Sequence, residues 1–417
     1  RETCALFDQS HHMTDLTIEG PDVLKLFSAL GVNSFAKFEV GKAKQLVACN
    51  PDGYVIGDGI LFFLDQNKVR LVGRPSAHNW VQYHAETDGY DVEMHRDERT
   101  AANPTGRREF YRYQVQGPTA MEVLEKATDG DLPEIKFFNL GEISIAARKV
   151  RALHHGMSGA PGLELFGPWE DGEAVKAALV EAGEDLGLAQ VGSRVYATNT
   201  LESGWIPSPM PAIFTGDEMK AYREWLPAES YEGTGSLGGS FYSDQIEDYY
   251  LTPHDLGYWQ FVKFDHDFFG REALEEIADE PRRKKVTLAW NGEDTTQAIG
   301  SMLEKGNPAK YIDFPLSNYS TWPYDKVLAH DEIVGLSTFS GYSFNEHSML
   351  SLAMVDVDLE EGAEVTLVWG EEGGGSKKPV VERHEQTEIR AIVSPCPYSE
   401  VARTSYAEGW RTKAGVT

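Results

Sequence analysis

Apolar and polar residues alternate along the chain in short blocks that predict both helices and strands. Between residues 21 and 30 the apolar side chains of Val23, Leu24, Phe27 and Leu30 keep to one helical face, and Gly31 is a typical stop signal. The same spacing predicts further helices at residues 77–85, 120–126 and 172–182. Residues 4–10 are interpreted as a short helix end that leads into a strand at residues 16–18.

The clearest strand signal is a turn, Asn50–Gly53, between the apolar runs Lys44–Cys49 and Val55–Leu64. Asn, Pro, Asp and Gly are the residues that tight turns prefer, so these two runs are predicted to pair as a β-hairpin. Shorter strands are predicted at residues 69–72, 111–115, 143–147 and 150–154. The polar run from Asp97 to Arg108 is predicted to be a surface loop.

Strands and helices are mixed without a regular strand–helix–strand repeat, which favours an α+β fold over a doubly wound parallel sheet. From about residue 280 the pattern changes to short strands and turns, which is typical of a small β-barrel. The predicted organisation is a region at 1–280 made of two interleaved α+β subdomains, a C-terminal barrel at 281–373 and an extended tail at 374–417.

Composition narrows the class of partner. The 417 residues carry a formal net charge of -28, which argues against nucleic acid or an anionic membrane surface, because both require clustered Lys and Arg. Cys4, Cys49 and Cys396 lie far apart and suggest neither a disulfide framework nor a zinc site. No apolar run is long enough to span a membrane. These features predict a cytoplasmic monomer or small homo-oligomer that acts on small molecules.

A glycine-rich loop, Gly156–Gly162, leads into the strand-like run Leu163–Pro168, which places Glu164 between two leucines. A carboxylate in apolar surroundings needs hydrogen-bond donors, and two parallel N–H groups of a flat heterocycle match its two oxygens. The glycines are expected to let the backbone approach such a ligand closely. The alternative is a strand-end glutamate that is capped by loop amides.

This loop, together with Gly162-Leu163-Glu164-Leu165 and Pro168, resembles the folate-binding signature of the glycine-cleavage T-protein (aminomethyltransferase) superfamily. Further matches follow in the same order along nearly the whole chain, at residues 6–11, 53–58, 115–118, 269–274 and 334–343. The resemblance implies T-protein-like domains of mixed sheets and helices around a central site, followed by a small barrel. It also implies tetrahydrofolate as cofactor, with Glu164 holding the pterin ring.

Two positions near the hairpin are site candidates on this resemblance. Asp58 matches the position where T-proteins keep an acid near the reacting folate nitrogen; the alternative is a strand-end aspartate that bonds turn amides. Arg74 stands where T-proteins usually carry asparagine. Since a guanidinium binds a carboxylate through two hydrogen bonds, Arg74 suggests an acidic substrate, with a surface ion pair as the alternative.

The segment Gln9-Ser10-His11-His12-Met13 supplies an imidazole that can polarise a group or accept a proton near neutral pH. T-proteins often show a single His before Met here. His12 is therefore the predicted substrate-facing residue and Gln9 a predicted substrate ligand, with core packing as the alternative for the histidine. No metal is predicted, because adjacent histidines on a strand point to opposite faces and no acid lies at ligand spacing.

Aromatic side chains complete the predicted site. Residues 195–205 resemble the family's R-x-x-x-L-E-x-G region, in which Tyr196 is the predicted proton donor to a leaving oxygen and Trp205 the predicted stacking face for a pterin ring. Tyr242, in an aromatic run after a Gly- and Ser-rich segment, is predicted to line the substrate pocket. Core or interdomain packing is the alternative for all three residues.

At the positions where it departs from T-proteins, this sequence resembles the tetrahydrofolate-dependent aromatic O-demethylases, which act on vanillate, 3-O-methylgallate or syringate. The matches lie at residues 7–13, 71–74, 162–165 and 198–207. The implied reaction moves a methyl group from a methoxy-aromatic acid to N5 of tetrahydrofolate and leaves a phenol and 5-methyl-tetrahydrofolate. The alternatives are dimethylsulfoniopropionate demethylase, glycine-cleavage aminomethyltransferase and a non-catalytic folate-binding protein, whose K-G-C-x-x-G-Q-E motif this chain lacks.

Overall fold

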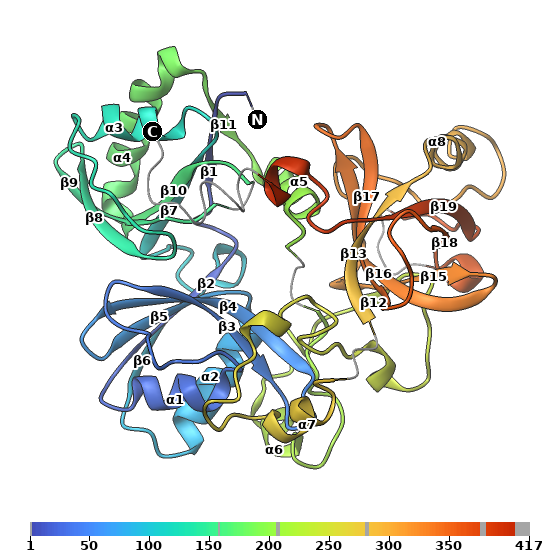
Figure 1. The fold of residues 1–417 in the computed structure, drawn as a ribbon, viewed down its shortest axis with the longest axis horizontal. Coiled ribbons are helices and arrows are strands. Elements are labelled where there is room, and N and C mark those ends of the chain that lie inside the picture. The colour runs from blue at the N-terminus through green and yellow to red at the C-terminus, as the bar shows by residue number, and fades with distance from the viewer. Residues whose placement is uncertain (1, 157–158, 206–208, 280–282, 376–380, 405–417) are drawn as a thin grey trace.

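The computed structural model describes residues 2–156, 159–205, 209–279, 283–375 and 381–404, without the side chains of Tyr196 and Ala197. Two β-sheets with their helices lie beside a closed β-barrel, and helix α5 (Ser193–Ser203) contacts both the first sheet and the barrel (Figure 1). Mixed sheets and helices followed by a barrel confirm the predicted α+β class.

The first sheet has the strand order β11-β1-β7-β10-β9-β8. Its strands are β1 (Cys4–Asp8), β7 (Phe110–Gln116), β8 (Leu140–Ile145), β9 (Arg148–Leu153), β10 (Gly162–Pro168) and β11 (Leu188–Val191). Helices α3 (Ala120–Ala127) and α4 (Gly172–Gly183) pack their apolar faces against it. The prediction of a helix end at residues 4–10 is wrong, because β1 pairs with β7 on one side and with β11 on the other.

The second sheet has the strand order β3-β4-β5-β2-β6. Its strands are β2 (Thr14–Glu19), β3 (Ala43–Cys49), β4 (Val55–Asp65), β5 (Lys68–Gly73) and β6 (Glu93–Asp97). Helices α1 (Val23–Leu30), α2 (Pro75–Thr87) and α6 (Lys220–Trp225) share one apolar core with it. The predicted hairpin is confirmed, because β3 and β4 pair antiparallel with Val47 opposite Asp58.

The barrel closes in the order β13-β17-β16-β15-β18-β19. Its strands are β13 (Arg283–Trp290), β15 (Asp325–Ala329), β16 (Glu332–Ser343), β17 (Ser348–Asp356), β18 (Glu364–Trp369) and β19 (Thr387–Ser394). Helix α8 (Gly292–Ser301) packs against β17 and β19. The tail predicted from residue 374 is wrong in part, since β19 is a barrel strand that buries Ile389, Ala391 and Val393 in the barrel core.

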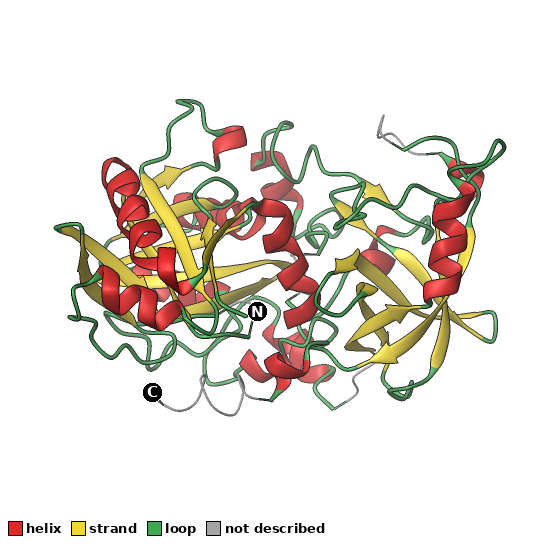
Figure 2. Cartoon of the chain, turned by 90° about the horizontal axis from the view of Figure 1, so that it is seen from above, coloured by secondary structure: helices red, strands yellow, loops and turns green. Residues whose placement is uncertain are grey.

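Smaller elements connect these bodies. A parallel pair, β12 (Leu237–Gly238) and β14 (Trp322–Pro323), joins the segment after α6 to the segment that enters the barrel. Helix α7 (Arg271–Glu276) precedes the barrel and α9 (Glu400–Arg403) follows it. Short 3-10 helices occupy residues 100–102, 169–171, 184–186, 246–249, 259–261 and 372–374. Seen from above, the barrel forms one end of the molecule and the two sheets form the other (Figure 2).

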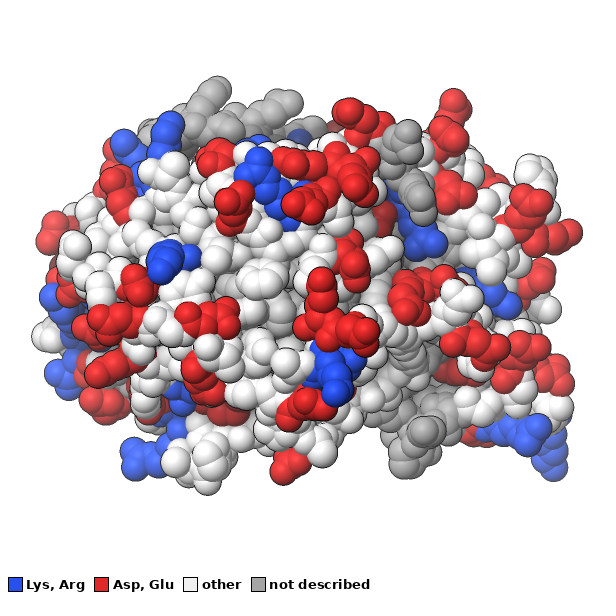
Figure 3. Space-filling view, turned by 90° about the horizontal axis from the view of Figure 1, so that it is seen from below, with Lys and Arg blue, Asp and Glu red and all other residues white. Residues whose placement is uncertain are grey.

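The surface reflects the acidic composition. On the face in Figure 3, Asp and Glu side chains are spread between the Lys and Arg side chains and form no single patch. Within the described part of the chain, no helix combines the length and the apolar character that a membrane crossing requires.

Candidate active site

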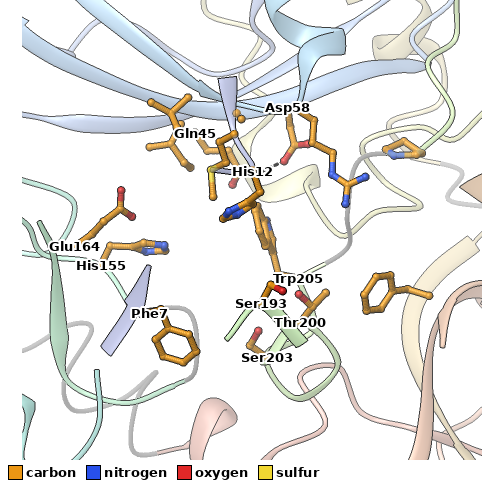
Figure 4. A pocket seen from close by; sticks show the side chains of 18 of the residues that line it. Phe7, His12, Gln45, Asp58, His155, Glu164, Ser193, Thr200, Ser203 and Trp205 are labelled. Atoms are coloured by element: carbon orange, nitrogen blue, oxygen red, sulfur yellow. Dashed lines mark hydrogen bonds between the residues drawn. The ribbon is translucent and has the colours of Figure 1, made fainter. Parts of the chain in front are cut away.

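A cavity of about 960 Å³ lies where the two sheets, α5 and the segment that enters the barrel meet. The predicted site residues that line it are His12, Asp58, Arg74, Glu164 and Trp205. In the view of Figure 4, Glu164 and His155 lie on one side, Asp58 lies on the other, and His12 and Trp205 lie between them. The structure thus brings five residues that are far apart in the sequence to one cavity.

Glu164 lies in the middle strands of the first sheet, where β10 pairs with β7 and Glu164 stands opposite Gln114. Its side chain is only 6% exposed, and its Oε1 accepts a hydrogen bond from Nη1 of Arg112. No described residue donates to its other oxygen, and the side chain lines the cavity. The carboxylate therefore has one fixed partner and one oxygen left for a ligand. Capping by loop amides, the alternative, is not found among the described residues, and the role of Glu164 in holding a ring stays a prediction.

Arg112 is the functional residue that the sequence reasoning missed. Its guanidinium is buried between the rings of Phe62 and Phe166, whose centroids lie 5.2 and 5.3 Å away. Its Nη2 donates to Oδ1 of Asp15 at 3.0 Å, and Asp15 accepts in turn from Nη2 of Arg108 at 2.6 Å. Because each buried charge has an opposite partner, the network holds the Glu164 carboxylate in one orientation.

The glycine loop is packed closely against its neighbours. A Cβ on Gly162 would lie 2.0 Å from the carbonyl oxygen of Val115, and a Cβ on Gly159 would lie 2.9 Å from Cα of Ala402. Both positions also have positive φ, which favours glycine. Close packing on β7 and on α9 therefore requires glycine at these two positions. Gly159 also lines the cavity, so the expected close approach of its backbone to a ligand stays a prediction.

Asp58 projects from β4 and is held by side chains, whereas turn amides were the alternative. Its Oδ2 accepts from Nε2 of Gln45 and from the hydroxyl of Tyr258, both at 3.2 Å. Burial, reinforced by the charge of Asp58, raises the pKa of Tyr258 well above its usual value, while hydrogen bonds with Gln45 and Trp205 act in the opposite direction. Tyr258 therefore stays protonated and keeps donating to Asp58.

His12 is kept neutral. Desolvation in the concave site, followed by the charge of Arg74, lowers the pKa of His12 to about 4. Arg74 is the residue before α2, and its Nη1 donates to the hydroxyl of Tyr231 at 3.2 Å. The surface ion pair that was the alternative for Arg74 is not found among the described residues. A neutral imidazole and a guanidinium therefore share this side of the cavity.

The other three predicted site residues are Gln9, Tyr242 and Tyr196. Gln9 is buried, its Nε2 donates to Oε1 of Gln114 at 2.7 Å, and its own Oε1 has no hydrogen-bond partner among the described residues, so its role as a substrate ligand stays a prediction. Tyr242 is 73% exposed, bonds Asp244 at 2.6 Å and does not line the cavity, so its prediction as a pocket residue is wrong. Tyr196 belongs to α5, but its side chain lies outside the described residues, and its role stays a prediction.

Comparisons with known proteins define the class. Residues 1–208 match the GCVT N-terminal domain family. The fold matches a crystal structure of glycine cleavage system aminomethyltransferase T from Bartonella henselae with a TM-score of 0.62, at 18% identity, over 96% of this chain and 87% of that chain. The chain belongs to the GCVT family, the superfamily of the aminomethyltransferase T-proteins.

Among individual relatives, syringate O-demethylase of a Sphingobium species is 52% identical over 99% of this chain and 89% of the relative. Sesamin methylene transferase of a Sinomonas species is 29% identical over 93% of this chain and 84% of the relative. Aminomethyltransferase of Streptomyces avermitilis is 30% identical over 72% of this chain and 70% of the relative. The predicted family is thus confirmed, and the similarity to the O-demethylase covers both the sheets and the barrel.

Proposed function

We propose that this protein is a tetrahydrofolate-dependent O-demethylase, which moves a methyl group from a methoxy-aromatic acid to tetrahydrofolate. One observation carries the proposal: a single cavity holds a buried carboxylate, Glu164, on one side and, on another, the guanidinium of Arg74, which has no acid partner in the described part of the chain. The first suits the N–H edge of a pterin and the second suits an aromatic carboxylate. The likeness to syringate O-demethylase supports the same reaction.

The residues present fit tetrahydrofolate. The free oxygen of Glu164 is an acceptor for an N–H group, and the cavity walls beside it include Phe7, Phe137 and Phe138, whose rings suit a flat heterocycle. Arg112 fixes the carboxylate from behind, so Glu164 does not reorganise when the ring binds. When bound, tetrahydrofolate supplies the nitrogen that accepts the methyl group.

The chain's own residues then orient the aromatic ether and its leaving oxygen. Arg74 binds the carboxylate of the substrate and fixes the direction in which the ring enters the cavity. His12, neutral at pH 7, hydrogen-bonds the ring substituents without adding charge. The leaving phenoxide takes up a proton, for which Tyr196 on α5 is the proposed donor. Asp58, held by Gln45 and Tyr258, lines the same cavity and orients the groups near the transferred methyl.

A substrate panel tests the proposal. The protein is incubated with tetrahydrofolate and syringate, vanillate, 3-O-methylgallate, dimethylsulfoniopropionate or an aminomethyl-loaded lipoyl carrier, and ether loss and folate products are followed by chromatography. We expect at least one methoxy-aromatic acid to be demethylated, only when tetrahydrofolate is present. Consumption of dimethylsulfoniopropionate or of the lipoyl adduct, with all three aromatic acids untouched, would replace this proposal by one of its alternatives.

A further inference from the structure

A second arginine, Arg99, lines the same cavity as Arg74. It lies two residues after the end of β6, in the polar run that the sequence suggested was a surface loop. The following residue, Thr100, contacts the histidine segment. The backbone N–H of Thr100 donates to the carbonyl of His11 at 3.1 Å, and the Thr100 hydroxyl and Nδ1 of His11 are 2.8 Å apart. This contact brings Arg99 to the His12 side of the cavity.

Arg99 has no carboxylate partner among the described residues, although the chain contains 66 acidic and 38 basic residues. Its Nε is buried and makes no hydrogen bond there. The neighbouring acid, Glu98, is already engaged, because Oε2 accepts from Nε of Arg96 at 2.8 Å and Oε1 accepts from the Arg99 backbone N–H at 3.0 Å. The Arg99 guanidinium is therefore a partly buried cation with unused donors.

Tyr231 links the two arginines. Its hydroxyl accepts from Arg74 at 3.2 Å, and the Arg99 guanidinium lies 5.6 Å from its ring centroid. The next residue, Glu232, is 3% exposed and accepts from Nδ2 of Asn79 at 2.8 Å and 3.1 Å, which fastens this segment to α2. One anchored tyrosine thus contacts Arg74 through its hydroxyl and Arg99 through its ring before any ligand arrives, which lowers the cost of ordering them on binding.

Two guanidiniums that contact the same tyrosine repel each other unless an anion lies between them. We propose that Arg99 is a second carboxylate-binding residue, which grips the acid group of the substrate together with Arg74, and that this pair restricts the enzyme to aromatic acids. The inference rests on the proposed function for the identity of the substrate. The carboxylates of a folate glutamate tail have the same chemistry, so the test must separate the two sources.

Binding of a compound that cannot react tests the pair without turnover. The dissociation constants of 4-hydroxybenzoate and of the neutral 4-hydroxybenzaldehyde are measured by calorimetry for the wild type, Arg99→Ala, Arg99→Lys and the control Arg107→Ala. Arg107 is exposed in the same run and lies outside the cavity. We expect Arg99→Ala to weaken binding of 4-hydroxybenzoate about tenfold and binding of the aldehyde less than about twofold. Arg99→Lys should give intermediate dissociation constants, and Arg107→Ala should bind both compounds like the wild type.

Equal weakening of acid and aldehyde, or no change in either, would overturn the inference. A second arm measures tetrahydrofolate with one and with several glutamates on the same variants. We expect no more than about a twofold change; a loss that grows with the number of glutamates while 4-hydroxybenzoate binds normally would assign Arg99 to the cofactor tail and also overturn it. Because no ether is broken, a protein that binds acids through Arg99 but demethylates nothing would refute the proposed function alone.

Discussion

The Glu164 side and the Arg74 side of the cavity hold their charges in opposite ways. Glu164 is part of a closed, buried network in which Arg112 bridges it to Asp15, and Asp15 in turn accepts from Arg108. Arg74 is exposed and lines the cavity, and its hydrogen-bond partner among the described residues is the neutral hydroxyl of Tyr231. The charge of Glu164 is thus already neutralised, whereas Arg74 keeps positive charge for an incoming anion, which is the division that the proposed cofactor side and substrate side require.

The largest effect is expected from cutting the closed network. Arg112→Met leaves Glu164 and part of Asp15 buried without their cation, which should lower the free energy of unfolding by about 3–5 kcal/mol. Arg74→Met, the matched change on the open side, should alter it by less than about 0.5 kcal/mol. Urea unfolding of both variants measures this difference. Similar stabilities for the two variants would remove the distinction between the two sides.

Next in size is the loss of the cofactor carboxylate. Glu164→Gln keeps the shape of the side chain but removes its negative charge, and it should weaken tetrahydrofolate binding by about tenfold or more. The dissociation constant of 4-hydroxybenzoate should stay within about twofold of the wild-type value, because this variant leaves Arg74 unchanged. Fluorescence titration with each ligand gives both constants. If the variant no longer bound 4-hydroxybenzoate but still bound tetrahydrofolate normally, the two assignments would be reversed.

Asp58 should affect turnover more than binding. Asp58→Asn keeps an acceptor for Tyr258 but removes the charge from the cavity, and we expect kcat to fall about tenfold to a hundredfold with KM for the acid nearly unchanged. Tyr258→Phe, which retains the charge and loses one fixed hydrogen bond, should fall between this variant and the wild type. Steady-state kinetics at saturating tetrahydrofolate separate kcat from KM. An effect of Asp58→Asn on KM alone would make Asp58 a binding residue.

The smallest effect concerns pH. The pKa of His12 is lowered to about 4, so the imidazole is neutral from pH 8 down to about pH 5 and gains charge only below that. The pH profile of kcat/KM should therefore show no His12-dependent inflection between pH 5.5 and 8. His12→Asn should shift the level of the profile and leave its shape in this window unchanged. An inflection near pH 6.5 that disappears in His12→Asn would contradict the neutral assignment.

Local patterns predicted much of this architecture. The Asn50–Gly53 turn fixed the hairpin that carries Asp58, and the apolar spacing of residues 21–30 predicted α1. The five-residue β1 was misassigned because so short a run has no clear period, and its pairing with β7 and β11 is set by tertiary contacts. The alternation of Ile389, Ala391 and Val393 was a usable signal for the last barrel strand.

The site was predicted only where a motif marked it. Glu164 and Arg74 lie in family-like motifs, whereas Arg112 and Arg99 acquire their roles from neighbours that are distant in sequence. Arg112 alternates with tyrosines on β7, and only the register with β10 places it behind Glu164. Tyr242 was chosen for its aromatic neighbours, yet its side chain is exposed and its hydroxyl donates to Asp244. Buried ion networks of this kind have no local sequence signature.

The account depends on transfer of a methyl group from an aromatic ether to folate in one cavity. Syringate or vanillate carrying a deuterated methoxy group, incubated with the protein and tetrahydrofolate, tests this most directly by mass spectrometry of both products. The account predicts that each labelled methyl lost from the ether is recovered intact on 5-methyl-tetrahydrofolate, and that Glu164→Gln slows both changes equally. Demethylation without label in the folate, or at the same rate without any folate, would contradict it.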